Sequence, residues 1–568
     1  MIDQADLHVL KPRQGLRLLA ACASLCAATL AQAQPLPQEQ TPAATPDLQM
    51  SDFLGESAPP PAAPLNKPAT ESPDKTAGDK DKAVRVPYLS EQQREEIKKE
   101  LRDEILATAA KENWAQPEAL PAWVRRTRIE GEILLRMEAD LMDKGNGAQF
   151  FNFQAINSGA PVNFTPPSDP SLVTVPFLNT TQNRTIPKLR AKLGLSYTLS
   201  DPMVFNFRLA TGNGGNPVST NQTLGTSFNK PQVLIDRAYV HYQMLAALSF
   251  DGGRAPNPFT TGTDLIWDRD LSFDGLGGRY RYSFSPQRSL QLALGAYSVE
   301  NTDLNYASNG LSKYASRDKW LLGAQLEWRG DLFKEQMLRV GAGFYDFTKV
   351  VGKFSSQCQA PGSANACSTD DSRPAFVQKG NTMFALRNLQ VQNENEDPTY
   401  QYFGLASQFR VLSLSASWDA PLSETVRVAL DADYARNLTF SPDKIRAQVP
   451  VNNLGPCANA SSCTAQQAWE GGGNAYQAQL RLGRPKLQRP GDWQAQFGYR
   501  YVQSDALLDA FTDSDFHLGG SNAQGYYVGG SFTFAPSATL GARYLSATEI
   551  TGPKLSIDVL QIDLAVRF

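Results

Sequence analysis

Long apolar runs, histidines and clustered cysteines are scarce in this chain. Of its 568 residues 20% are charged and the mean hydropathy is -0.36, and no stretch approaches the roughly 20 apolar residues of a membrane helix. A helical membrane protein is therefore excluded. The three histidines, His8, His241 and His517, lie far apart, so we expect no metal site. No Gly-x-Ser-x-Gly motif or evident nucleophile accompanies them, which predicts a protein that is not an enzyme and needs no cofactor.

The amino terminus is typical of an export signal. Basic residues up to Arg17 precede the apolar stretch 18–30, and Ala31-Gln32-Ala33 fits the small-x-small cleavage rule. We predict a signal peptide at 1–33 and export to the bacterial outer membrane. A lipoprotein signal ending at Cys22 is the alternative, but it would leave almost no apolar region after Arg17.

Residues 34–85 are rich in proline, alanine and charged side chains, a composition that cannot bury a core, and they predict a disordered linker. The linker is either a simple spacer or a contact to peptidoglycan. Residues 86–116 predict a periplasmic helix, because Ser90 and Gln93 form a capping box and no glycine or proline interrupts Glu91 to Lys111. Its narrow apolar stripe favours a short coiled coil over a solvated single helix.

Residues 124–568 change to a period of two. From Arg126 onward, about 16 segments alternate apolar with polar side chains, which predicts an all-β transmembrane antiparallel up-and-down β-barrel with lipid outside and water inside. Within 402–418 the apolar phase slips near Val411 and Leu412, so we expect a bulge there. The last strand, 560–568, ends on Phe568, which is typical of the assembly signal read by the barrel-assembly machinery.

The connectors between these segments alternate strictly between long and short. Tight turns such as Ser200-Asp201-Pro202 and Ala535-Pro536-Ser537 follow even-numbered segments, and long connectors follow odd-numbered ones. This parity predicts that the short turns and both chain termini of the barrel domain lie on the periplasmic side, and that the long loops lie outside.

Four cysteines remain after the predicted signal peptide. Cys358 and Cys367 fall in one long connector, and Cys457 and Cys463 fall in another. Two local pairs in an oxidising compartment predict loop disulfides. Metal binding is the alternative, but neither pair has a nearby histidine or a zinc spacing.

The predicted exported chain has a proline-rich tether, then a helical segment from Val86-Pro87-Tyr88-Leu89 to Glu112-Asn113-Trp114-Ala115, then Leu120-Pro121-Ala122-Trp123 and a barrel. This order of segments resembles the bacterial "putative porin" family. The resemblance covers roughly residues 84–568. It implies a channel but names no substrate.

Charged side chains on the inward faces of the segments predict a net basic wall, although the whole chain carries a net charge of -3. Because rings of one charge sign set ion preference, we expect mild anion selectivity. Alternatively, these arginines only pair with acids along the wall. The pore-lining basic residues that we single out are Arg128, Arg190, Arg208, Arg237, Arg279, Arg281 and Arg427.

The connector 254–270 follows the fifth segment, where trimeric porins fold a loop into the barrel. We predict that it forms a pore constriction, with Arg254, Asp264, Asp268 and Asp270 as its charged residues. Acids on the loop facing a basic wall would set up a field across the eyelet. An ordinary exposed loop is the alternative.

The most direct functional prediction is an outer-membrane porin for passive diffusion of small hydrophilic solutes or ions. The alternative is a structural tether that binds the cell wall through the linker and helix. Expected partners are the lipid bilayer, lipopolysaccharide and two further copies in a homotrimer, and we expect no nucleic acid.

Overall fold

The computed structural model describes residues 98–100, 121–164, 175–333, 335–360, 362–393, 397–453 and 468–568. The predicted signal peptide and linker lie outside these residues. So does the predicted helix at 86–116, except for residues 98–100, which are helical and exposed. No helix in the described ranges is long and apolar enough to cross a membrane.

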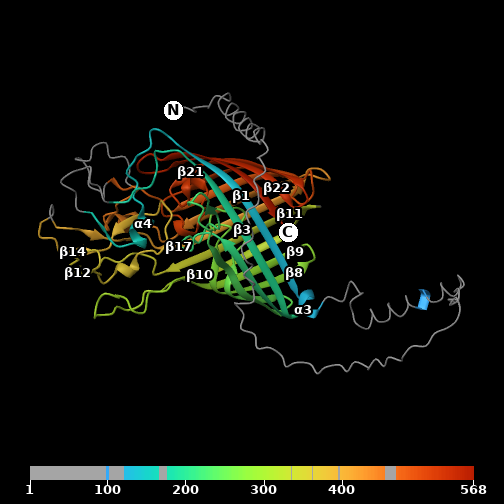
Figure 1. Ribbon diagram of the computed structural model, residues 1–568, viewed down its shortest axis with the longest axis horizontal. Helices are drawn as coiled ribbons and strands as arrows, with labels where there is room; N and C mark the ends of the chain where they lie inside the picture. Colours follow the sequence, from blue (N-terminus) through green and yellow to red (C-terminus); the bar gives the residue numbers. More distant parts are fainter. Residues whose placement is uncertain are drawn as a thin grey trace, which may run out of the picture. The chain divides into compact units, whose positions relative to one another are not determined.

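Antiparallel strands form one closed barrel, as predicted (Figure 1). The sheet has 17 strands, of which sixteen are long and one, β5 (Gln222–Thr223), has two residues. The long strands are β1 (Thr127–Met142), β3 (Arg184–Ser200), β4 (Met203–Thr211), β6 (Val233–Leu245), β7 (Leu248–Pro256), β8 (Ser272–Ser285), β9 (Arg288–Glu300), β10 (Lys319–Phe333), β11 (Gln336–Thr348), β17 (Phe409–Pro421), β18 (Arg427–Asn437), β19 (Asn474–Gly483), β20 (Trp493–Val502), β21 (Ala523–Ala535), β22 (Ala538–Glu549) and β23 (Ser556–Arg567).

Short elements precede the barrel or lie in its long connectors. They are α3 (Ala122–Arg125), α4 (Phe153–Ser158), α5 (Pro442–Arg446), the 3-10 turns η2 (Asp370–Ser372), η3 (Asp509–Phe511) and η4 (Phe516–Leu518), and the small strands β2 (Val162–Asn163), β12 (Gln357–Cys358), β13 (Met383–Ala385), β14 (Asn388–Leu389), β15 (Tyr400–Gln401) and β16 (Phe403–Leu405).

The first and last strands close the barrel. β1 pairs with β3 on one side and with β23 on the other, so every long strand has two neighbours and no edge is left open. Phe568 completes the seam, because its backbone N–H donates to the Gly131 carbonyl oxygen at 3.0 Å and its carbonyl oxygen accepts from the Gly131 N–H at 2.9 Å. Its ring lies so close to Gly131 that a Cβ there would be 2.2 Å from it.

Alternation along β1 shows how the two faces differ. Ile133, Leu135 and Met137 point outward and are 46–49% exposed, whereas Arg136 and Glu138 point inward and are under 10% exposed. Successive side chains of a strand point to opposite faces. The outward apolar residues can therefore be covered by lipid, while the charged residues meet one another inside.

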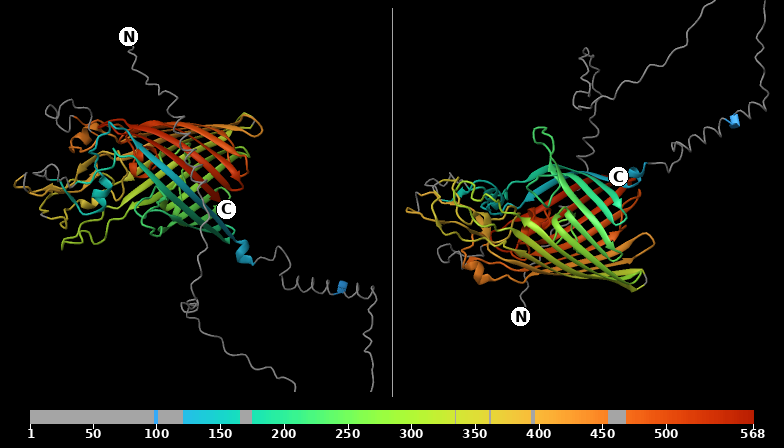
Figure 2. Two further views of the ribbon diagram at one scale, coloured as in Figure 1. Left: turned by 45° about the horizontal axis from the view of Figure 1, so that its top comes forward. Right: turned by 90° about the horizontal axis from the view of Figure 1, so that it is seen from below.

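The tight turns, α3 and the carboxy terminus lie at one end of the barrel, and the long connectors gather at the other (Figure 2). The predicted parity is confirmed with one exception. The connector from β22 to β23 spans only residues 550–555, although it lies at the end with the long loops. Both strands simply continue further than the apolar pattern indicated.

The predicted bulge at Val411 and Leu412 is wrong. The pairings of β17 with β11 and β18 run without a register shift through these residues. The apolar phase slips because residues 403–408 belong to a loop, where β16 pairs with β13, and not to the barrel strand. Register shifts occur elsewhere, both beside turns, as at Thr198/Ser200 and Thr533/Ala535, and within β4 at Arg208/Leu209.

Candidate functional site

The connector between β7 and β8, residues 257–271, folds into the lumen. The Thr260 backbone N–H donates to Gln325 Oε1 on β10 at 2.7 Å, and the Thr263 N–H and hydroxyl donate to Asp433 Oδ2 on β18 at 2.5 and 2.6 Å. Gly262 lies against the wall so closely that a Cβ would be 3.0 Å from the Ala416 carbonyl oxygen. A loop that leaves β7 and reaches β18 must cross the barrel.

Aromatic and aliphatic side chains anchor this loop to one side of the wall. Phe259, Leu265, Ile266 and Trp267 are at most 4% exposed. The rings of Phe259 and Trp267 lie 5.0 and 5.1 Å from the ring of Tyr345 on β11, measured between centroids. The wall leaves space for them, since a Cβ on Gly323 would be 2.3 Å from the Phe259 ring. Such packing excludes water from this side of the lumen.

A second connector, residues 503–522, enters the lumen and contacts the first. The Asp268 N–H donates to the Phe511 carbonyl oxygen at 2.8 Å, and the Ser514 N–H donates to Asp268 Oδ2 at 3.1 Å. Leu507 and Leu508 of this connector join the same apolar cluster as Trp267. The two loops therefore form one body inside the barrel.

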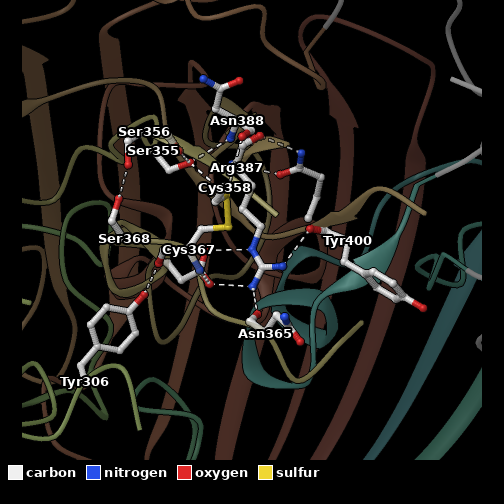
Figure 3. The surroundings of a disulfide bond; sticks show 12 residues. Tyr306, Ser355, Ser356, Cys358, Asn365, Cys367, Ser368, Arg387, Asn388 and Tyr400 are labelled. Carbon is white, nitrogen blue, oxygen red and sulfur yellow. Dashed lines mark hydrogen bonds and ion pairs between the residues drawn. A yellow bond between two sulfur atoms is a disulfide. The ribbon is translucent and has the colours of Figure 1, made fainter. Parts of the chain in front are cut away.

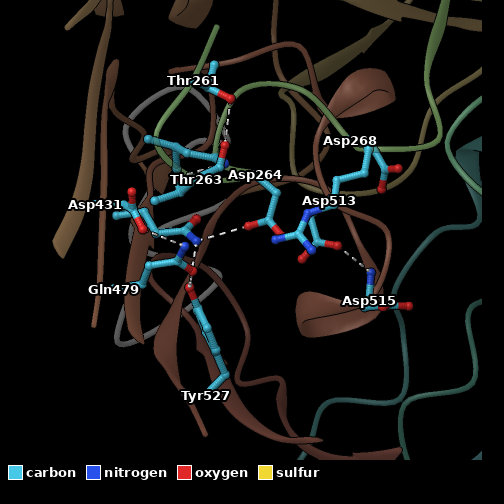
Figure 4. A network of polar contacts seen from close by, with 12 residues as sticks. Thr261, Thr263, Asp264, Asp268, Asp431, Gln479, Asp513, Asp515 and Tyr527 are labelled. Atoms are coloured by element: carbon cyan, nitrogen blue, oxygen red, sulfur yellow. Dashed lines mark hydrogen bonds and ion pairs between the residues drawn. The ribbon is translucent and has the colours of Figure 1, made fainter. Parts of the chain in front are cut away.

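Arg500 on β20 ties both loops to the wall. Its guanidinium donates to Asp264 Oδ1 at 2.5 Å and to Asp513 Oδ2 at 3.0 Å, while the Gln477 amide also donates to Asp264 Oδ1 at 2.9 Å. Arg500 is 2% exposed. Figure 4 shows Asp264, Asp268, Asp513 and Asp515 gathered in this network.

Two carboxyls of the first loop have opposite pKa shifts. Burial raises the pKa of Asp268 to about 8, and the neighbouring Asp513 adds to the shift. Burial alone would also raise the pKa of Asp264, but the Arg500 and Arg269 guanidiniums outweigh it and hold that pKa well below its usual range. At neutral pH Asp264 is therefore charged and Asp268 carries a proton.

The predicted constriction residues occupy different positions. Asp264, Asp268 and Asp270 lie on the inserted loop, and Asp270 is paired at 2.6 Å with Lys192 of β3. Arg254 belongs to β7 and not to the loop, and its guanidinium is 2.7 Å from Asp274 on β8. Asp264 and Asp270 are therefore paired with basic side chains, whereas Asp268, among the described residues, accepts only backbone N–H groups of Asp270 and Ser514, which differs from the predicted row of acids facing a basic wall.

The predicted pore-lining arginines divide into three groups. Arg190, Arg208, Arg279 and Arg427 form ion pairs with Glu132, Asp236, Asp251 and Asp419, respectively. Arg128 is exposed at the barrel rim, 4.0 Å from Glu130. Within the described part of the chain, Arg237 and Arg281 have no carboxylate within ion-pair distance and contact Ser272 and Gln291.

The open part of the lumen lies on the side of the tight turns and comprises three cavities that share lining residues. The largest, about 850 Å³, is bounded by β1, β3 and β21 to β23 on one side and by the two inserted loops on the other. Arg136 extends into it and joins Asp515 at 3.0 Å and Asp563 at 2.7 Å. This cavity is lined by charges of both signs.

A disulfide joins Cys358 and Cys367 in the long connector between β11 and β17, with an S–S distance of 2.09 Å (Figure 3). Beside it, the buried Arg387 guanidinium donates to both carboxylate oxygens of Asp370 at 2.9 and 2.6 Å. Cys457 and Cys463 lie outside the described residues. In the described ranges no group of three or more His, Cys, Asp and Glu side chains could hold a metal ion.

Sequence reasoning missed the second inserted loop and the ion pairs that the inward-facing Arg136 and Arg500 make with its residues Asp515 and Asp513. One signal was present: residues 505–515 alternate apolar residues with Asp505, Asp509, Asp513 and Asp515. Such a mixture is unusual for a solvated outer loop, because the apolar residues require burial and the acids then require partners.

A family model described as "Putative porin" matches residues 9–568. The chain belongs to this family. It is accordingly a porin-like channel of the outer membrane, and the family is one of channels and not of enzymes. No curated protein matches the sequence.

Several solved structures resemble the barrel, each over 78% of this chain. The outer-membrane channel DcaP of Acinetobacter baumannii is 11% identical with a TM-score of 0.36 over 98% of its own length. OprB of Pseudomonas putida is 10% identical with a TM-score of 0.40 over 95%. OmpT of Vibrio cholerae, described as a trimer form, is 10% identical with a TM-score of 0.36 over 99%.

Proposed function

We propose that this porin allows passive diffusion of small hydrophilic solutes or ions through a lumen narrowed by the loop 257–271, with a mild preference for anions. The observation that carries the proposal is the pairing of that loop with Gln325, Asp433 and Arg500 on distant strands. A loop held on several sides narrows the lumen without closing the polar cavities beneath it. Short hydrophilic solutes are the class that suits such a passage.

The expected anion preference is supported by an imbalance in pairing. Carboxylates neutralise Arg190, Arg208, Arg279 and Arg427. These four agree with the alternative in which the arginines only pair with acids along the wall. Arg237 and Arg339 contact only the hydroxyls of Ser272 and Ser417 among the described residues, so their charge is not cancelled. A surplus positive charge in a low-dielectric lumen raises the local anion concentration.

Single-channel recording of the purified, refolded protein in a planar bilayer tests this function. In a KCl gradient we expect stepwise openings and a reversal potential of the sign that marks chloride as the more permeant ion. A reversal potential favouring potassium would contradict the selectivity, and a stably inserted barrel without openings would contradict the channel.

A homotrimer is proposed from porin precedent, with openings in threes as its expected signature. The alternative function, a tether to the cell wall, depends on residues 34–116. Those residues lie outside the described ranges apart from residues 98–100, so the tether stays a prediction. Binding of the mature protein to isolated cell wall would support it.

A further inference from the structure

The second part of the open lumen is a cavity of about 500 Å³ directly beside the inserted loop. Four arginines from four different elements line it: Arg237 of β6, Arg269 of the loop, Arg339 of β11 and Arg481 of β19. Asp268 is the only acidic side chain in its described lining, and burial together with Asp513 raises the pKa of that carboxyl to about 8. In the lining of this cavity the four guanidiniums therefore outnumber the single carboxyl.

The carboxylates near these arginines already have other partners. Asp236, adjacent to Arg237, is paired with Arg208, and Asp270 is paired with Lys192. On the opposite side, Asp419 is paired with Arg427. Arg237 and Arg339 are left with a serine hydroxyl each, at 3.4 and 3.2 Å.

The other two arginines, Arg269 and Arg481, each lie close to a carboxylate. Arg269 is 3.4 Å from Asp264, and its side chain is 73% exposed to the lumen. Asp264 in turn is shared with Arg500. Arg481 is neutralised by Asp431 at 2.7 Å, so it contributes donors more than net charge.

We propose that this arginine-lined cavity binds a small solute through a carboxylate or phosphate group. This inference rests on the proposed channel and specifies what occupies it. Guanidinium groups present paired N–H donors that match the oxygens of such anions. A volume of about 500 Å³ falls within the range of small-molecule sites.

The cavity is also accessible. It shares Arg339, Arg481 and Gln494 with a third cavity of about 450 Å³, which contains Asp419 and Arg427 near the tight turns. It shares Arg269 and Gln496 with the largest cavity. A solute can therefore approach the arginines from the tight-turn end of the lumen.

Isothermal titration calorimetry of the detergent-purified full chain with inorganic phosphate tests this inference. We expect saturable binding to the wild type. The double variant R237Q/R339Q should bind phosphate at least roughly tenfold more weakly for each guanidinium removed, because a hydrogen bond to a charged group contributes on that order. The matched control R288Q/R489Q removes two exposed arginines beside tight turns and should bind as the wild type does.

Absence of saturable phosphate binding to the wild type, or equal binding to R237Q/R339Q, would overturn the proposal. If the double variant does not fold, the single variants R237Q and R339Q should each show a smaller loss of phosphate affinity. Unchanged phosphate binding in both single variants would also overturn the proposal. Calorimetry does not depend on conduction. Phosphate binding by a barrel that shows no openings in bilayers would therefore support the site and contradict the channel. Channel openings without phosphate binding would support the channel and contradict the site.

Discussion

The two sides of the lumen are built differently although the same inward-facing strand positions form both. Along β8 to β11, inward residues such as Phe273, Tyr297 and Tyr345 are aromatic and pack against the loop 257–271. Along β1, β3 and β23, inward residues such as Arg136 and Asp563 are charged and border a cavity of about 850 Å³. The apolar side holds the inserted loops and the polar side leaves a route for solutes.

One lumen can therefore hold both the inserted loops and a passage for solutes. Apolar contacts fix the loops to one wall without the need for matched charges, since the gain from burying apolar surface depends little on direction. The charged side chains of the opposite wall pair with one another, as Arg136 does with Asp515 and Asp563, because an unpaired buried charge is costly. Three predictions test this division.

Removal of the apolar anchor should have the largest effect. Deleting residues 259–266 takes away Phe259, Leu265 and Ile266, so we expect single-channel conductance to rise several-fold. The matched control deletes 224–231, an equally long segment that is exposed throughout. Equal conductance of the two deletion variants would show that the loop does not limit the passage.

Breaking the link between the loops and the polar wall should mainly reduce stability. Arg500→Gln leaves Asp264 and Asp513 buried without their shared cation, which we expect to cost about 3 kcal/mol or more of unfolding free energy. Chemical denaturation followed by circular dichroism measures this loss.

Arg567→Gln is the control for Arg500→Gln, because it breaks a rim pair with Glu132 whose arginine is 56% exposed. Such exposed pairs contribute at most about 1 kcal/mol. A loss in Arg500→Gln no larger than in this control would contradict the role of Arg500 as the link between the loops and the wall.

The smallest expected effect is a pH dependence of ion preference. The carboxyl of Asp268 is protonated below about pH 8 and loses its proton as the pH rises through that value, which places a negative charge beside Arg269. The chloride preference should therefore decrease above about pH 8. Reversal potentials of the wild type and Asp268→Asn measure it, and the variant should keep its preference across that range. A parallel decrease in both proteins would assign the change to another group.

Much of the barrel was predictable from local patterns. The period of two from Arg126 to Phe568, and the turn residues at Ser200-Asp201-Pro202, predicted the sixteen strands and the end at which they turn. The pattern failed at residues 403–408, where apolar residues face a loop core instead of lipid. Lipid and a packed loop both cover apolar side chains, so the pattern alone does not distinguish them.

The candidate site was predictable only in part. Asp264, Asp268 and Asp270 lie on the loop 257–271, but Lys192, the partner of Asp270, and Arg500, the partner of Asp264, lie 78 and 236 residues away in the chain. Ion pairs between such distant residues depend on how the strands curve into a barrel and on how deeply each loop enters it.

The amino-acid sequence by itself determined the strand count, the polar and apolar faces, and the parity of turns and loops, because these depend on alternation and on turn chemistry within a few residues. Only the tertiary structure decided which arginines are neutralised and which, such as Arg237 and Arg339, remain available. The physical reason is that charge pairing depends on distances across the lumen, and these arise only when the sheet closes and the loops fold inward.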